Sequence, residues 1–259
     1  MGRIWAIGDL HLSFSSEKPM WVFGDIWKDH DEKIKESCEK CVGAEDVLLI
    51  LGDISWALKT ADADADLTWV SALPGRKVLL RGNHDLWWTS VSKLRARYPG
   101  LSFLQNDCLL VGNAGEAADA SDEAADASGE AAGAVDADAR VVLCGSRGWV
   151  LPNDQNYAPE TDEKIYLREL ARMKLSLQAA RRTGAGRIIV CIHFPPAVNG
   201  ARSGFTDLFE EYGVSKVVYG HLHGKDAWKK GIKGTLNGVE YILAAADYTN
   251  FTPILVTTY

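Results

Sequence analysis

The strongest constraint on the fold is a series of short apolar runs, rich in Val, Ile and Leu, that alternate with longer amphipathic stretches. This alternation is typical of repeated strand and helix units, so we expect an α/β fold. Most runs lack the polar alternation of a half-exposed strand, which predicts burial on both faces of a sheet. The clearest strands are expected at residues 3–7, 46–51, 77–80, 140–144, 187–192 and 216–219.

Helices are expected where apolar residues recur along one helical face. Asp29 and Glu32 have the spacing of a capping box before one such stretch, which predicts a helix start at Asp29. A longer helix is expected over residues 161–182, with Gly184 as its stop. Two or three further strands are expected within residues 239–258.

Polar residues able to bind metal follow most of the predicted strands. Asp9 and His11 come after the first strand, and because alternate residues of an extended chain face the same way, their side chains are expected to converge. His221 and His223 repeat this spacing after a later strand. The carboxyl ends of neighbouring strands meet at one edge of a sheet, which predicts a common site there. The full set of candidates is Asp9, His11, Asp53, Asn83, His84, Asp85, His193, His221 and His223.

The composition of this set indicates which ions it would bind. Oxygen and nitrogen ligands without a thiolate suit Mn²⁺, Fe or Zn²⁺ better than Ca²⁺ or a structural zinc. His84 and Asp85 are candidates for catalysis rather than for metal binding. The other seven are too many ligands for one ion, which favours two ions that share a carboxylate. Glycines precede several candidates and permit sharp turns close to an ion. His30 is the one histidine outside these motifs, and its charged neighbours predict an exposed position.

The motifs, in their order along the chain, resemble the signature of the calcineurin-like metallophosphoesterases. They read Asp9-x-His11, Gly52-Asp53, Gly82-Asn83-His84-Asp85, His193 and Gly220-His221-x-His223. The resemblance implies a four-layer α/β/β/α sandwich of two mixed β-sheets flanked by helices, with a dimetal site at the carboxyl ends of the strands. It further implies that Asp9, His11 and His223 hold one ion, that Asn83, His193 and His221 hold the other, and that Asp53 bridges them.

A phosphoesterase mechanism follows from the same resemblance. Two cations lower the pKa of a shared water enough to supply hydroxide near neutral pH, and they offset charge on the phosphoryl oxygens. The family implies that His84 acts as the general acid for the leaving group, with Asp85 expected to orient its imidazole. The alternative for His84 is a purely structural role beside the ligands.

The substrate class is less constrained than the chemistry. We expect a small phosphorylated substrate. The Asp-x-His opening and the His193-x-Pro195-Pro196 segment resemble small bacterial phosphodiesterase-like members of the family, and the chain also resembles an uncharacterised bacterial branch of it. These resemblances favour a phosphodiester over a phosphomonoester. A nucleotide or a phosphoprotein stays open, and the sequence does not predict the oligomeric state. The alternative function is a non-catalytic metal-binding scaffold on the same fold.

An acidic segment accounts for the net charge of -7. Residues 113–139 contain eight acidic residues and no Lys or Arg, so the remaining chain carries about +1. This Ala-, Asp- and Glu-rich segment is predicted to be a flexible insertion in a single domain spanning residues 1–259. No strongly basic stretch indicates nucleic acid as a partner.

The remaining sequence signals concern location, thiols and aromatic residues. The absence of a signal peptide or a long apolar run, with five dispersed cysteines, predicts a cytoplasmic protein without a membrane anchor. Cys38 and Cys41 fit core packing better than a zinc or redox site. Four tryptophans near strand ends fit either an aromatic wall around the site or core packing: Trp56, Trp87, Trp88 and Trp149.

Overall fold

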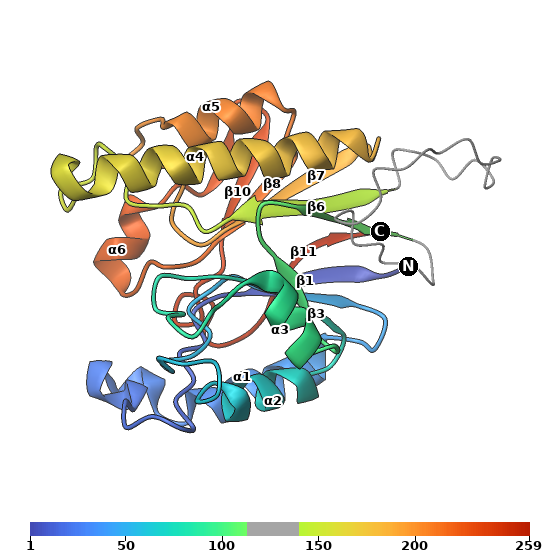
Figure 1. Ribbon diagram of the computed structural model, residues 1–259, viewed down its shortest axis with the longest axis vertical. Coiled ribbons are helices and arrows are strands. Elements are labelled where there is room, and N and C mark those ends of the chain that lie inside the picture. The colour runs from blue at the N-terminus through green and yellow to red at the C-terminus, as the bar shows by residue number, and fades with distance from the viewer. Residues whose placement is uncertain (113–139) are drawn as a thin grey trace.

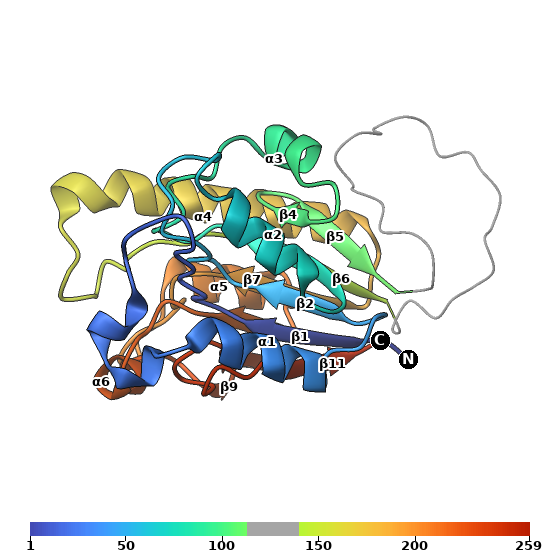
Figure 2. The same cartoon turned by 90° about the horizontal axis from the view of Figure 1, so that it is seen from below.

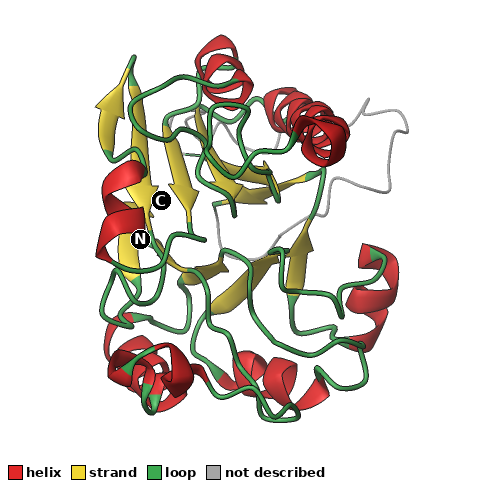
Figure 3. Cartoon of the chain, turned by 90° about the vertical axis from the view of Figure 1, so that its left-hand side faces the viewer, coloured by secondary structure: helices red, strands yellow, loops and turns green. Residues whose placement is uncertain are grey.

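The computed structural model describes residues 1–112 and 140–259 and confirms the predicted sandwich of two mixed sheets. The sheets lie face to face, and helices cover the outer face of each (Figure 1). Seen from the side, the chain forms four layers (Figure 3). The predicted acidic insertion, residues 113–139, lies outside the described residues, and the single-domain assignment stays a prediction.

The first sheet contains five strands in the order β11-β1-β2-β3-β4. The strands β1 to β4 are parallel, and β11 pairs antiparallel with β1 at the edge. Their bounds are β1 (Arg3–Ile7), β2 (Val47–Ile50), β3 (Arg76–Leu80), β4 (Ser102–Leu104) and β11 (Ile254–Thr258).

The second sheet contains six strands in the order β5-β6-β7-β8-β10-β9. Its four central strands are parallel, and β5 and β9 pair antiparallel at its two edges. Their bounds are β5 (Cys108–Val111), β6 (Val141–Ser146), β7 (Arg187–Ile192), β8 (Lys216–Tyr219), β9 (Gly234–Leu236) and β10 (Val239–Leu243).

Two groups of helices form the outer layers (Figure 2). The helices α1 (His30–Cys41), α2 (Asp64–Ala72) and α3 (Val91–Arg97) pack on the first sheet. The helices α4 (Pro159–Arg182) and α5 (Gly204–Glu211) pack on the second. The remaining short elements are the 3-10 turns η1 (Met20–Phe23) and η2 (Asp25–Trp27) and the helix α6 (Lys225–Lys230). In the described residues, no helix is both long and apolar enough to span a bilayer.

The core has three layers because the central strands bury both faces. In β2, Leu48 and Ile50 face the helices of the first sheet, whereas Leu49 faces the second sheet. In β7, Val190 faces α4 and α5, and Ile189 faces the first sheet. Each such side chain contributes about 1.5–3 kcal/mol through removal from water. This two-sided burial explains why the strands read as continuous apolar runs.

Most predicted elements are confirmed, with corrections at their ends. The strands predicted at 3–7, 187–192 and 216–219 have those bounds, and the strand predicted at 140–144 begins at Val141 and continues to Ser146. The long helix begins at Pro159 because proline fits the first helical turn. The predicted capping box is wrong: Asp29 adopts a left-handed backbone (φ 51°), and its side chain makes no capping hydrogen bond.

The prediction that His30 is exposed is also wrong. The His30 side chain is buried, with Nε2 at 2.9 Å from the Leu10 carbonyl oxygen and Nδ1 at 3.1 Å from the Trp27 carbonyl oxygen. Its charged sequence neighbours Glu32 and Lys33 are exposed, whereas the His30 side chain points to the loop after β1. His30 thereby attaches α1 to the loop that carries Asp9 and His11.

The strand pairing beside the acidic segment leads to a deletion test. Because β5 and β6 are antiparallel and Val111 pairs with Val141, the described residues that flank the acidic segment are neighbours. We expect that replacing these 27 residues by an Asn-Gly turn leaves cooperative unfolding and metal uptake intact. Thermal unfolding and metal analysis of the deletion variant measure this. Loss of either property would show that the segment has a structural role.

Candidate metal centre

The structure brings all the predicted ligands to one place, the carboxyl edge shared by the two sheets. The first sheet contributes loops after β1, β2 and β3, and the second contributes loops after β7 and β8. These loops carry Asp9, His11, Asp53, Asn83, His193, His221 and His223. The site therefore forms where the edges of the two sheets meet, as the fold resemblance implied.

The backbone at four of these residues is left-handed. The φ angles are 62° at Asp9, 47° at His11, 51° at Asp53 and 71° at His221. This conformation is unfavourable by about 1–2 kcal/mol for a residue with a side chain, and it persists only where the surroundings enforce it. The side chains of Asp9 and His11 do converge as predicted, but they do so through a sharp turn rather than through alternation along an extended strand.

Glycines allow the loops to approach each other closely. A Cβ atom at Gly82 would lie 2.1 Å from Asp53 Oδ1, and one at Gly220 would lie 2.6 Å from Asp9 Oδ2. Either contact is far below van der Waals distance, so a side chain at these positions would displace a site carboxylate. This confirms the role predicted for the glycines that precede the ligands.

One group of potential ligands consists of Asp9, His11 and His223. His11 Nε2 lies 3.3 Å from His223 Nε2, and His223 Nε2 lies 3.8 Å from Asp9 Oδ1. All three ligand atoms fall within 4.8 Å of one another. Asp9 and His11 are buried, whereas His223 is exposed, so the point on which these nitrogen and oxygen atoms converge is open on the His223 side.

A second group consists of Asp53, His193 and His221, with Asn83 beside them. His193 Nε2 lies 3.2 Å from His221 Nδ1 and 3.5 Å from Asp53 Oδ2. Asn83 Oδ1 lies 2.8 Å from His193 Nε2. This group has the same mixture of oxygen and nitrogen ligands as the first.

Asp53 lies between the two groups. Its Oδ2 atom is 3.9 Å from His11 Nε2 and 3.5 Å from His193 Nε2. Its Oδ1 atom accepts a hydrogen bond of 2.8 Å from the His84 backbone N–H. The residues thus fit two adjacent divalent cations, since the Asp53 carboxylate of the second group also lies beside His11 of the first.

The electrostatics of the site indicate the same need for cations. Burial lowers the pKa of His11 and of His221 well below the ordinary value, so both imidazoles are neutral ligands. Burial raises the pKa of Asp9 to about 7. For His193, burial acts to lower the pKa, but the adjacent Asp53 outweighs it and raises the pKa to about 9. A bound cation would stabilise the carboxylates and displace the proton from His193.

Further contacts orient the imidazoles. Asp247 Oδ1 lies 3.0 Å from His223 Nδ1, and Oδ2 accepts a 3.0 Å hydrogen bond from the Gly224 N–H. The Leu51 carbonyl oxygen lies 2.9 Å from His193 Nδ1. Such partners fix which ring nitrogen faces the metal. Sequence reasoning missed Asp247, although it follows β10 as the other site residues follow their strands.

His84 and Asp85 have different surroundings from those expected. His84 is partly exposed, with Nε2 at 4.0 Å from Asp53 Oδ2 and its ring centre 4.4 Å from that of Trp56. Asp85 is fully buried and accepts hydrogen bonds from the N–H groups of Ile54 (2.8 Å) and Gly82 (2.7 Å) and from Trp87 Nε1 (2.9 Å).

The expected pairing of Asp85 with the His84 imidazole is therefore wrong for this structure. No hydrogen bond joins the two side chains in the described residues, and the Asp85 carboxylate instead ties the loop after β3 to the loop after β2. Burial and the nearby Asp53 raise the pKa of Asp85 to about 6. Asp85 is thus a residue that positions the loops, and its carboxylate does not face the reaction site.

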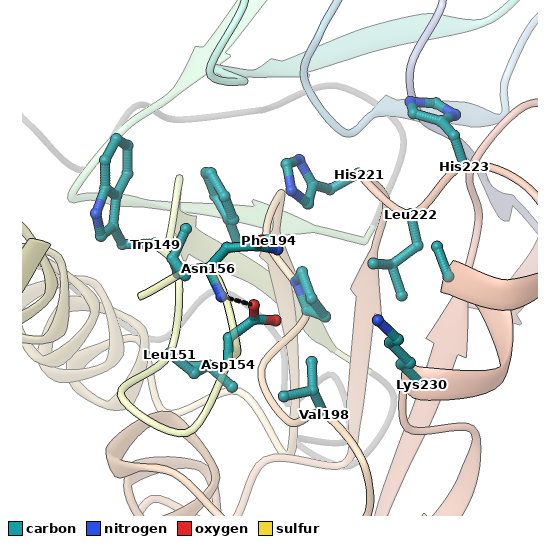
Figure 4. Close-up of a pocket in the computed structure, with 13 residues that line it drawn as sticks. Trp149, Leu151, Asp154, Asn156, Phe194, Val198, His221, Leu222, His223 and Lys230 are labelled. Carbon is teal, nitrogen blue, oxygen red and sulfur yellow. Dashed lines mark hydrogen bonds between the residues drawn. The ribbon is translucent and has the colours of Figure 1, made fainter. Parts of the chain in front are cut away.

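Two cavities open beside the metal centre. The one we call the His84 cavity has a volume of about 450 Å³, and its walls include His11, His84 and His223. The other, the Trp149 cavity, has a volume of about 230 Å³ and contains His221 and His223. In Figure 4, Trp149, Phe194 and His221 follow one another along one side of the Trp149 cavity, and Lys230 reaches in from the opposite side.

The four tryptophans named from the sequence divide between the two roles considered. Trp56 and Trp149 line the His84 and Trp149 cavities, respectively. Trp87 and Trp88 are buried in the core between the first sheet and its helices. Cys38 also belongs to that core, and Cys41 packs against it, as predicted.

Comparisons with known proteins agree with the fold and the site. The family model described as "Calcineurin-like phosphoesterase" matches residues 2–225. The Gene 66 protein of Mycobacterium phage D29 is 41% identical over 87 residues, which are 33% of this chain and 41% of the phage protein. This chain thus spans less than half the length of that relative.

Solved structures show the same architecture at low sequence identity. A protein of unknown function from Aquifex aeolicus is 17% identical with a TM-score of 0.50, and the match covers 98% of this chain and 96% of that one. The protein TT1561 of Thermus thermophilus is 11% identical with a TM-score of 0.52, and the match covers 98% of each chain. These likenesses confirm the fold.

The central position of Asp53 gives a test by substitution. Asp53→Asn keeps the shape of the side chain and an oxygen for the His84 N–H, but removes the negative charge between the two ligand groups. We expect it to abolish tight binding of both cations, whereas His11→Ala weakens only one. Metal content after dialysis, measured by mass spectrometry, distinguishes the variants. Two tightly held ions in Asp53→Asn would contradict the bridging position.

Asp247 gives a second test that leaves every predicted ligand in place. Asp247→Asn removes the negative charge next to His223 Nδ1, and we expect metal affinity to fall by roughly 10- to 100-fold, the usual effect of such a partner. Asp226→Asn is the matched control, because Asp226 is exposed on α6 and contacts Lys229. Competition with a metal-binding dye measures both. Equal affinities in the two variants would show that Asp247 does not support His223.

Proposed function

Because the chain belongs to the calcineurin-like phosphoesterase family, we propose that it is a metal-dependent phosphoesterase that holds two divalent cations and hydrolyses a phosphodiester. The observation that carries the proposal is the pair of ligand groups on either side of Asp53. Family membership supports phosphoesterase chemistry in general, and the diester preference is our own inference.

We assign the ligands as the motifs imply. Asp9, His11 and His223 hold one ion, and Asn83, His193 and His221 hold the other, with Asp53 between them. The absence of thiolates among these ligands favours Mn²⁺, with Fe or Zn²⁺ as the alternatives. When bound, the two cations lower the pKa of water and offset the negative charge that develops on the phosphoryl oxygens.

His84 is placed to provide the proton that the leaving oxygen needs. Its imidazole borders the His84 cavity, is partly exposed to solvent and lies 4.0 Å from the central Asp53 carboxylate. Burial lowers the pKa of His84, while Asp53 acts to raise it. The lowered pKa makes the protonated imidazole a stronger acid, which favours proton transfer to a departing alkoxide.

The two cavities support a diester over a monoester. A phosphodiester carries two organic substituents, and the centre opens on two separate spaces that share His223. If a substituent on the His84 side is the leaving group, its departing oxygen receives the proton from His84. The other substituent can lie against Trp149 and Phe194. A monoester would occupy only one of these spaces.

The role of His84 can be tested with two leaving groups. His84→Ala should lower turnover by roughly 10²- to 10⁴-fold for a diester with an alkoxide or ribose leaving group, which must be protonated. The same variant should be far less impaired on bis(4-nitrophenyl) phosphate, because nitrophenolate departs without a proton. Turnover of both substrates is measured on one Mn²⁺-loaded preparation.

Metal content is the control for this comparison. His84 is not among the assigned ligands, so both ions should remain bound in His84→Ala. Equal losses of turnover on the two substrates, with the ions still bound, would exclude general-acid catalysis by His84. If the wild-type protein with two bound ions hydrolysed no phosphate ester, the proposed function itself would be wrong.

A further inference from the structure

The walls of the His84 cavity are largely apolar. Beyond the three histidines, they consist mainly of hydrophobic and aromatic side chains from η1, η2, α6 and the loop after β2, namely Met20, Phe23, Ile26, Trp27, Trp56 and Trp228. Asp247 also lines the cavity, but its carboxylate is bound to His223 and to the Gly224 N–H. Lys225 is the other charged residue in the lining. A polar group in this cavity would therefore find few partners.

The rim of the cavity exposes large apolar side chains to water. Phe23 is 61% exposed and Ile26 is 45% exposed, and both line the cavity. A single exposed apolar residue is ordinary, but several around an opening mark a surface that binds an apolar group. The two residues belong to consecutive turns, η1 and η2, so one short segment supplies the outer wall.

The inner wall is held in place without a ligand. The rings of Trp56 and His11 stack with their centres 4.7 Å apart, and Trp56 Nε1 lies 3.2 Å from Met20 Sδ. The Lys18 ammonium lies over the Trp56 ring, 3.5 Å from its centre. Trp27 packs edge-on against His223, with centres 5.6 Å apart. The cavity is thus preformed and directly continuous with the metal ligands.

The position of His84 determines which part of a substrate enters this cavity. His84 lines the His84 cavity and is absent from the lining of the Trp149 cavity. A general acid must lie beside the oxygen that departs. The departing alcohol therefore lies on the apolar side of the centre, and the part that stays on phosphorus lies on the Trp149 side.

We propose that the substrate is a phosphodiester whose leaving alcohol carries an extended apolar chain, and that this chain binds in the His84 cavity between Trp56 and the Phe23–Ile26 rim. The inference rests on the proposed function and names its substrate class. Hydrolysis adds water across the P–O bond: the water oxygen joins phosphorus and gives up one proton to solvent, and the P–O bond to the apolar alcohol breaks. The departing alkoxide takes a proton from His84, which solvent then replaces. A longer chain buries more apolar surface on binding.

The test is the affinity of the Mn²⁺-loaded protein for alkylphosphonates of different chain length, measured by calorimetry. Methyl-, butyl- and octylphosphonate share one head group that the metal centre can bind. Each methylene that leaves water should tighten binding by a factor of roughly two to four. We expect octylphosphonate to bind at least about tenfold more tightly than butylphosphonate.

Variants of the rim locate the chain. Phe23→Ser combined with Ile26→Ser should remove most of the advantage of octyl- over butylphosphonate and leave methylphosphonate affinity unchanged. The matched control is Trp21→Ser, because Trp21 lies on the same turn as Phe23, is 56% exposed and does not line the cavity. The control should keep the full preference for the octyl chain.

Three results would overturn the inference. One is equal affinity for butyl- and octylphosphonate. Another is a chain-length preference that Trp21→Ser reduces as much as the rim variant does. The third is a ligand-free dimer in sedimentation that the rim variant converts to a monomer, since a second copy of the chain would then cover the rim.

Hydrolysis of bis(4-nitrophenyl) phosphate by the same preparations separates this inference from the proposed function. Hydrolysis without any chain-length preference in binding would overturn the inference alone. A chain-length preference that depends on the rim, in a protein that hydrolyses no phosphate ester, would support the apolar binding site and overturn the proposed function.

Discussion

The close approach of the loops around Asp53 is the constraint on which the rest of the site depends. Burial acts to raise the pKa of Asp53, but the adjacent His193 and the His84 N–H outweigh it and keep the carboxylate charged. The charge can lie there only because Gly82 has no side chain to displace it. Since Asp53 reaches residues from both sheets, this contact also fixes how the edges of the sheets meet.

Asp85 joins the Asp53 loop to the loop after β3. Its carboxylate accepts hydrogen bonds from two consecutive N–H groups of the Asp53 loop and from one in its own loop. Asp53 in return accepts the His84 N–H. The two loops are thus joined in both directions by charge-assisted hydrogen bonds, which are stronger than those between neutral groups. These bonds give the strained backbone at Asp53 the support that it needs.

The sequence predicted the fold and the residues that lie together at the sheet edge because both depend on local patterns. Apolar runs such as β2 identify buried strands, and the polar residues after them necessarily meet at one edge. The roles of Asp85 and His30 were mispredicted because sequence neighbours suggested partners that the structure does not use. Asp85 contacts a loop some 30 residues earlier, and His30 turns inward from a charged stretch. The His84 cavity combines six separate stretches of the chain, from His11 to Asp247, so no single pattern in the sequence could indicate it.

The pairing of β1 with β11 has a consequence for how the protein is made on the ribosome. β1 lies between β2 and β11, so it lacks one of its two neighbours until residues 254–258 have been synthesised. Contacts between such distant parts of a chain slow folding, because a long stretch must be ordered before they form. Until then, the nascent chain exposes an unpaired strand edge, the feature that chaperones protect from aggregation.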